Sequence, residues 1–282
     1  MAGGSGGSPP RAGTDIPLRV VPVQHLRRAR GALGGRGSLH LVERHALVYR
    51  RTWLVLASGV AEPLFYLLSI GVGLGGLVGP VNGLSYAAFV APALLASASM
   101  NGALFDSTFN VFFRLKYEKL YDAALATPMR AADVALGEIS WALLRGGLYA
   151  VAFLVVMAAM GLIHSAWALA ALPAALLTGF AFAASGMAAT TYMRSWQDFE
   201  YITVATLPMF LFSTTFYPLS VYPGPLQVVV ECTPLYQSVV LVRSLTLGTV
   251  GPDLLLHAAY LAVLGLVGLF IAGRRIGQLL LR

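Results

Sequence analysis

Long apolar stretches separated by short polar connections are the main pattern along this sequence. Six of them approach the roughly 20 residues that a helix needs to cross a bilayer. Polar and apolar residues do not alternate within them, as they would in the strands of a membrane barrel. Lipid offers free backbone groups no partner, so the stretches are predicted to be helical. The predicted spans are residues 52–75, 86–112, 138–162, 166–191, 199–217 and 254–273.

The segment before the first span has two parts. Residues 1–37 are rich in Gly, Ser, Pro and Arg, and are predicted to form a disordered basic tail. Residues 38–51 are predicted to form an amphipathic helix that lies in the membrane interface, with its arginines near the lipid headgroups. An ordinary cytoplasmic helix leading into the first span is the alternative. The apolar positions that share a helical face are Leu39, Val42, Ala46 and Tyr49.

The connection formed by residues 113–137 is charged and favours a helix. Thr127-Pro128 predicts that this helix ends near Ala126, because the residue before a proline disfavours helical backbone. A helix held beside the membrane suits the docking of a soluble partner. A plain loop helix without a partner is the equally open alternative.

The connection formed by residues 218–253 is mostly apolar, but prolines interrupt it. Irregular backbone at membrane depth survives only where protein or water shelters it. Two short re-entrant helices are therefore predicted, at about residues 224–231 and 234–246. A seventh complete span is the alternative, which would place the two termini on opposite sides of the membrane.

Composition agrees with a membrane protein that crosses the bilayer several times. Apolar residues make up 57% of the 282 residues and charged residues 11%, whereas soluble domains are about a quarter charged. This excludes a soluble enzyme, and also disorder over most of the length. The net charge of +7 comes from residues that flank the spans, so no nucleic-acid partner is indicated. The single cysteine, Cys232, excludes an intrachain disulfide and a multi-cysteine metal site.

Lysine and arginine predict the orientation of the spans. Outside the spans they fall almost entirely in alternate connections, namely the N-terminal segment, residues 113–137, residues 192–198 and the C-terminal tail. The other connections contain only Arg243. Basic residues accumulate on the cytoplasmic side of a membrane protein. The sequence therefore predicts six spans, with both termini in the cytoplasm of a cell membrane.

Several sequence motifs that are typical of soluble enzymes are missing or occur in the wrong structural context. The sequence contains no glycine-rich phosphate loop ending in lysine, so ATP and Mg²⁺ would have to be bound by another chain. Gly71–Gly76 matches the dinucleotide pattern but lies at the end of a span, where close helix packing is the better interpretation. The five histidines lack metal-ligand spacing, and we interpret them as interfacial or loop residues. No cofactor or metal is predicted on this chain.

Polar residues inside spans are costly and mark candidate functional positions. Asp106 and Arg145 are predicted to lie at similar depth, where they could form an ion pair that braces two helices or could contact a substrate. Glu62 beside Pro63 is a candidate for a moving or substrate-facing element. Asn101 is a further candidate for the path. A set of large apolar residues could line the path or fill the core: Met100, Phe105, Phe109, Phe112 and Phe113.

Five groups of residues carry a family resemblance: Glu62–Tyr66 with Gly71–Gly79, Tyr86–Pro92, Lys116–Asp122 with Ala126–Pro128, Phe216–Pro218 with Tyr222-Pro223, and Thr233–Tyr236 continuing to Arg243. Taken together, these groups resemble the membrane subunits of type-2 ATP-binding cassette (ABC) exporters. Within that family the chain is most similar to the lipo-oligosaccharide (nodulation-factor) exporter branch and related drug-resistance permeases. Where the family's C-terminal signature usually has His, Arg, Ser or Tyr, this chain has Gln237.

The resemblance implies roles for three segments. Residues 115–126 would be the coupling helix that docks on a nucleotide-binding ATPase subunit, and residues 38–51 would be the connecting helix. The region between spans five and six would help to close the path from outside. Two permease copies and two ATPase subunits would form the exporter. The residues implied are Tyr117, Glu118, Lys119, Leu120, Tyr121 and Asp122 in the coupling helix, and Tyr222, Pro223, Pro234 and Arg243 in the outer region.

The sequence thus predicts a transport subunit rather than an enzyme. Its substrate would be a lipid-like, glycolipid or amphipathic drug molecule, moved out of the cytoplasm or the inner leaflet. A membrane-embedded transferase is one alternative, but the acidic residues lie on separate spans rather than in one cluster. A passive channel without an ATPase partner is the other.

Overall fold

The computed structural model describes residues 36–50, 61, 64–118, 120–121, 129 and 131–280, and these residues are almost entirely helical. This agrees with the predicted all-helical class. Most of the predicted tail, the first part of the first span, Glu62 and half of the predicted coupling helix lie outside the described residues. The elements are α1 (Arg36–Arg50), a π-helix (Leu67–Gly73), α3 (Gly75–Val78), α4 (Tyr86–Phe105), a second π-helix (Asp106–Asn110), α5 (Val111–Lys116), α7 (Ala131–Ala159), a 3₁₀ turn (Ala166–Ala170), α8 (Ala171–Thr190), a 3₁₀ turn (Trp196–Asp198), α9 (Phe199–Phe212), a 3₁₀ turn (Leu219–Val221), α10 (Gly224–Glu231), α11 (Pro234–Leu247) and α12 (Leu254–Leu280).

Among the described residues, four helices are long and apolar enough to cross a membrane, or five if a bent pair counts as one span. The four occupy Tyr86–Lys116, Ala132–Ala159, Ala166–Thr190 and Leu254–Leu279, close to four of the predicted spans. The predicted span 199–217 corresponds to α9, which has only 14 residues. It ends early because Thr214 adopts a left-handed backbone with φ of 60°, which a helix cannot continue.

Helix α8 lies at the centre of the bundle and packs against α4, α7, α11 and α12. Its sequence is rich in Ala, Gly, Ser and Thr, and such small residues let neighbouring helix backbones approach closely. The closest approach is at Gly268 of α12, where an added Cβ would lie 2.7 Å from the backbone of Ala184. Gly186 makes a similar approach to Ser107. Packing of small residues therefore holds the core together.

Helices α10 and α11 form a pair bent by 83°, at the positions where two short helices were predicted. The bend follows from the chain chemistry at residues 232–234. Pro234 occupies the first turn of α11, where its missing N–H costs nothing, and the Thr233 hydroxyl accepts from the Tyr236 N–H at 3.4 Å. Gly248 ends α11 in the left-handed conformation.

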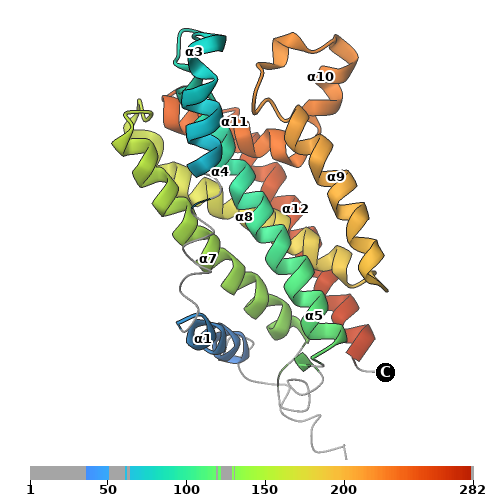
Figure 1. Ribbon diagram of the computed structural model, residues 1–282. Coiled ribbons are helices and arrows are strands. Elements are labelled where there is room, and N and C mark those ends of the chain that lie inside the picture. The colour runs from blue at the N-terminus through green and yellow to red at the C-terminus, as the bar shows by residue number, and fades with distance from the viewer. Residues whose placement is uncertain are drawn as a thin grey trace, which may run out of the picture. The chain divides into compact units, whose positions relative to one another are not determined.

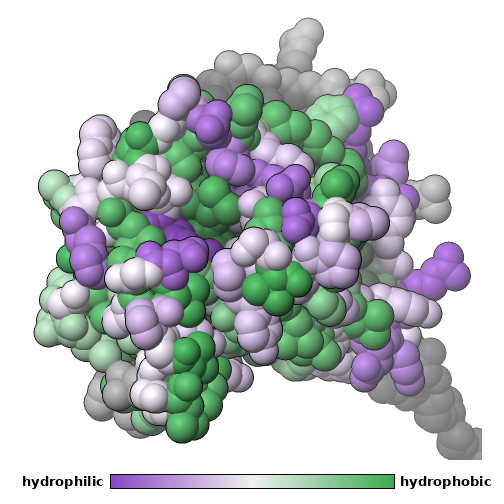
Figure 2. Space-filling model, turned by 90° about the horizontal axis from the view of Figure 1, so that it is seen from above, coloured by the Kyte–Doolittle hydropathy of each residue, from purple (hydrophilic) through white to green (hydrophobic). Residues whose placement is uncertain are grey.

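The two ends of the bundle differ (Figure 1). Helices α1 and α5 and the last turns of α12 lie at one end, called here the α1 end, and α3 and α10 lie at the other, the α10 end. The surface of the α10 end mixes hydrophilic and hydrophobic side chains (Figure 2). Helix α9 runs along one side of the bundle, and none of its residues is buried. A cavity lies between α9 and α4.

Candidate functional site

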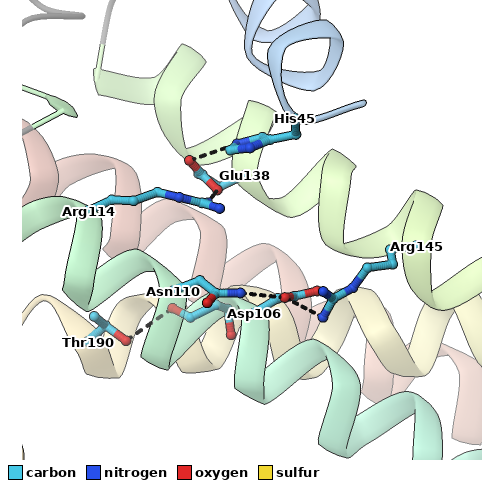
Figure 3. Close-up of polar contacts among 8 residues, drawn as sticks. His45, Asp106, Asn110, Arg114, Glu138, Arg145 and Thr190 are labelled. Carbon is cyan, nitrogen blue, oxygen red and sulfur yellow. Dashed lines mark hydrogen bonds and ion pairs between the residues drawn. The ribbon is translucent and has the colours of Figure 1, made fainter. Parts of the chain in front are cut away.

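The predicted pair of Asp106 and Arg145 is present in the structure. An Arg145 guanidinium nitrogen lies 2.5 Å from Asp106 Oδ1, and both side chains are at least nine-tenths buried. Asn110 donates to the same Oδ1 at 2.8 Å (Figure 3). The Arg145 guanidinium also lies over the Tyr149 ring. The burial of these two charged side chains is tolerated because each one compensates the charge of the other. The pair joins α4 to α7.

A π-helical turn positions Asp106. One extra residue per turn at Asp106–Asn110 leaves backbone groups without their normal helical partners. The Thr190 hydroxyl of α8 lies 3.1 Å from the Ser107 carbonyl and 2.9 Å from the Gly186 carbonyl of its own helix, so the two carbonyls share its one hydrogen. Sequence reasoning did not identify this turn. The spacing of Asp106 and Asn110 by four residues was the one available signal.

A cavity of about 750 Å³ lies between α4, α7 and α9, and the ion pair forms part of its wall. The wall is mainly apolar, with a limited number of hydroxyl and amide groups. The Ser97 side chain is buried, and within the described part of the chain its hydroxyl has no hydrogen-bond partner. The polar lining residues are Tyr66, Ser97, Ser99, Asn101, Asp106, Arg145, Tyr149, Thr203 and Thr206, and the apolar ones include Leu94, Leu95, Phe105, Phe153, Leu207 and Phe210.

A second cavity of about 290 Å³ adjoins the first, with which it shares Asn101, Phe105, Thr203 and Thr206. Aromatic rings gather beside it. Trp196 lies with its ring centroid 5.0 Å from that of Phe109 and 5.3 Å from that of Phe199. The predicted apolar lining is thus present for Phe105 and Phe109, whereas Met100 and Phe112 are buried in the packing.

A turn between α8 and α9 places Trp196 in this aromatic group. Asp198 accepts from the backbone N–H groups of Arg194 at 2.6 Å and Ser195 at 3.1 Å. These hydrogen bonds lower the pKa of the exposed Asp198 carboxyl, so the turn is held by a charged acceptor at neutral pH.

A second polar cluster lies near the α1 end, centred on Glu138 of α7 (Figure 3). His45 Nε2 of α1 lies 3.2 Å from one oxygen of the Glu138 carboxylate, and Arg114 of α5 donates to the other. Tyr121 is fully buried beside them. Burial, followed by the negative charge of Glu138, raises the pKa of the Tyr121 phenol well above its usual value. Three helices and the segment after α5 therefore meet at one carboxylate.

The position of His45 corrects the interpretation of the histidines as interfacial or loop residues. His45 is 3% exposed and its ring lies 5.6 Å from that of Trp141. Helix α1 approaches α7 closely because Gly137 leaves room for Leu41. The hydrophobic pattern of α1 does not reveal this contact, because His45 falls outside the apolar stripe.

The remaining predicted residues fall in three places. Tyr117 and Glu118 are exposed, Leu120 is half-buried, and Lys119 and Asp122 lie outside the described residues. Asn101 lies beside Asp106 and Arg145 in the cavity wall. In the α10 region, Pro223 directly precedes α10, Pro234 is the first residue of α11, and the Tyr222 carbonyl accepts from Gln227 at 2.7 Å. Sequence reasoning missed Ser97, Thr203 and Thr206, whose hydroxyl side chains within apolar stretches were the available signal.

Comparison with known protein families identifies the family to which the chain belongs. Residues 38–247 match the model of the family described as ABC-2 type transporter. The chain belongs to the ABC-2 type transporter family. The matched range includes both polar clusters and both cavities. This ABC-2 permease is therefore an integral membrane subunit of a transporter, in agreement with its long apolar helices.

Relatives of the permease cover most of its length. Nodulation protein J of Rhizobium leguminosarum bv. trifolii is 33% identical over 251 residues, which is 87% of this chain and 96% of the relative. Nodulation protein J of Rhizobium meliloti (strain 1021) is 33% identical over 234 residues, covering 80% and 89%. That of Azorhizobium caulinodans is 28% identical over 228 residues, covering 79% and 90%. The resemblance to the nodulation-factor exporter branch is thereby confirmed.

Proposed function

We propose that this chain is the permease subunit of an ATP-driven exporter for a lipid-like, glycolipid or amphipathic drug molecule. The cavity between α4, α7 and α9 carries the proposal, because its wall combines apolar side chains with convergent hydroxyl and amide groups. An unsatisfied buried hydroxyl costs about 1–3 kcal/mol, so Ser97 favours a ligand that brings a polar group to it. The adjoining aromatic cavity would take the apolar part of the molecule.

The proposed topology has six spans with both termini in the cytoplasm, and the α1 end faces inward. The described basic residues support this orientation, because those of α1, α5 and the last turns of α12 lie at that end. In this arrangement α1 would lie at the membrane surface, and α10 with α11 would form a re-entrant pair on the outer side. Residues 1–37 would form a disordered tail in the cytoplasm.

Two partners complete the proposed exporter. A nucleotide-binding ATPase would dock on the segment that contains Tyr117 and Glu118, and it would bind the ATP and Mg²⁺. The Glu138 cluster supports coupling, because it connects the segment after α5 directly to α7 and α1. A second copy of the permease would cover α9, none of whose residues is fully buried within one chain.

The ATPase partner is tested by co-purification from native membranes in mild detergent. A tagged permease is expected to recover a stoichiometric nucleotide-binding subunit. Changing exposed Tyr117 and Glu118 together to alanine should lower that recovery roughly tenfold, as loss of an interface anchor does. The matched control changes an exposed tyrosine and glutamate at the α10 end, Tyr217 and Glu231, and should leave recovery unchanged. Purification of the permease alone would favour a passive channel or a membrane-embedded transferase.

The cavity is tested by filling it without disturbing the packing. Gly102 of α4 and Gly146 of α7 both line the cavity, and a Cβ added to either meets no atom within 4 Å. Gly146→Leu should weaken binding of rhodamine 6G, an amphipathic probe, by roughly tenfold, because steric overlap of this kind costs about 1–3 kcal/mol. Fluorescence anisotropy with the purified permease measures it. Gly273→Leu, also in open space but outside the cavity, is the control. Equal binding by both variants would place the substrate site elsewhere.

A further inference from the structure

Arg243 of α11 is a largely buried cation that contacts only uncharged groups among the described residues. Its Nε donates to the Phe89 carbonyl of α4 at 3.2 Å, and one terminal nitrogen donates to the Thr214 carbonyl at 2.7 Å. The other terminal nitrogen lies 3.4 Å from the Thr214 hydroxyl. The guanidinium also lies 4.0 Å from the centre of the Phe89 ring. All its polar contacts are therefore with two neighbouring elements rather than with a carboxylate.

Both of the accepting carbonyl groups belong to places where a helix is interrupted. Phe89 lies three residues before Pro92, whose missing N–H removes the helical hydrogen bond to the adjacent Ala88 carbonyl, so Phe89 lies beside the interruption. Thr214 follows the end of α9, where the last carbonyls of a helix have no helical partner. Free backbone groups are not tolerated at membrane depth unless another group satisfies them. Arg243 supplies donors to the backbone beside the interruption in α4 and to the backbone just after the end of α9.

The position of these contacts relates them to the cavity. Leu94 and Leu95 of α4 line the cavity one turn beyond Phe89, and Phe210 of α9 lines it shortly before Thr214. Arg243 therefore lies just beyond the cavity, toward the α10 end. We infer that Arg243 closes this end of the cavity by holding the end of α9 against α4. A weaker contact helps, because the Tyr86 hydroxyl lies 3.5 Å from the Phe216 carbonyl.

The functional importance of this closure rests on the proposed function, because in an exporter the substrate would leave at the α10 end. Release of the substrate would then require the contact that Arg243 makes between α4 and α9 to open. A lysine could replace the charge but not the arrangement of the donors, since its three N–H groups share one nitrogen whereas the guanidinium presents its N–H groups in a fixed fork. Arg243 is thus a positioning residue, and its shape as well as its charge should be required.

Cysteine labelling tests the closure. In a Cys232→Ser background, Ala98→Cys places a thiol in the cavity wall, and a membrane-impermeant maleimide is added to the outside of intact cells. Labelling should be slow with Arg243 present and about tenfold faster or more in Arg243→Gln, because several directed hydrogen bonds from a charged group are lost. Arg243→Lys should be intermediate, and Tyr86→Phe should change the rate little.

Two controls separate closure from general damage. Arg274→Gln also removes an arginine placed over an aromatic ring, 4.3 Å from the Phe270 centroid, but at the α1 end, and should not change labelling. A thiol introduced by Ala184→Cys, in the fully buried contact of α8 with α12, should stay unlabelled in Arg243→Gln. Labelling of that thiol, or equal rates for Ala98→Cys with and without Arg243, would overturn the inference.

The same experiment remains informative if the proposed function fails. Labelling needs neither an ATPase nor a substrate, so a permease without either would still show the effect of Arg243. Exposed Cys232 in the otherwise unchanged chain reports whether the α10 end faces outward. If Cys232 is labelled only from the inside, the proposed topology is wrong, and the reagent is then added from that side to test the closure itself.

Discussion

Arg145→Met is expected to destabilise the permease by about 3–5 kcal/mol, because it leaves the buried Asp106 carboxylate without its cation. Asp106 is 6% exposed and Arg145 7%, so water reaches the carboxylate only from the cavity side and replaces little of the lost partner. Asn110 would still donate to the carboxylate, but a neutral amide compensates only part of the lost interaction. A large drop in melting temperature, measured by scanning fluorimetry in detergent, would report the loss.

The double variant Asp106→Leu, Arg145→Met provides the decisive comparison. Replacing both partners by apolar residues removes the uncompensated charge, and such replacements are often neutral or stabilising. The double variant should therefore melt above either single variant. Arg194→Met, which removes an exposed arginine, should change the melting temperature little. Additive losses in the double variant would mean that the two residues do not act as a pair.

Glu138→Ala is expected to cost a comparable amount, about 3–5 kcal/mol, because it leaves Arg114 without its buried carboxylate. His45 loses its partner in the same step, so α1 should detach from α7 more readily. Hydrogen exchange measured by mass spectrometry should show faster exchange in α1 and α5. In a complex with an ATPase, the ratio of transport to ATP hydrolysis should fall.

The exposed pair of His40 and Glu43 is a matched control for this variant. Its atoms lie 3.6 Å apart, but both side chains are 76% exposed. Exposed pairs contribute about 0–1 kcal/mol, so Glu43→Gln should change neither stability nor exchange measurably. Equal effects of the two substitutions would show that burial of Glu138 does not matter.

Local chemistry predicted several elements from the sequence. The apolar runs at 86–112 and 254–273 match two long helices, because length and hydropathy are properties of a single segment. The prolines near residue 234 predicted the short pair α10 and α11 for the same reason. The pairing of Asp106 with Arg145 was predictable because two opposite charges at similar depth have few other ways to be satisfied.

Features that depend on contacts between distant segments could not be predicted. The burial of His45 requires α1 to lie on Gly137, which is 92 positions along the chain from His45. The cavity arises because α9 stands away from α4, and hydropathy assigns both simply to the membrane. The role of Arg243 was predicted only as membership of an outer region, since its two partners are backbone carbonyls that no residue type reveals.

Helix α9 has no buried residue, and this has a consequence for selectivity. Its two ends are held, by the aromatic group around Trp196 and by Arg243, while its middle forms one wall of the cavity. Displacing the middle of such a helix breaks few packed contacts, so the wall can yield to guests of different bulk at little energetic expense. A site bounded by one compliant wall discriminates poorly by size. The permease should therefore accept a graded series of homologous amphiphiles rather than one exact molecule.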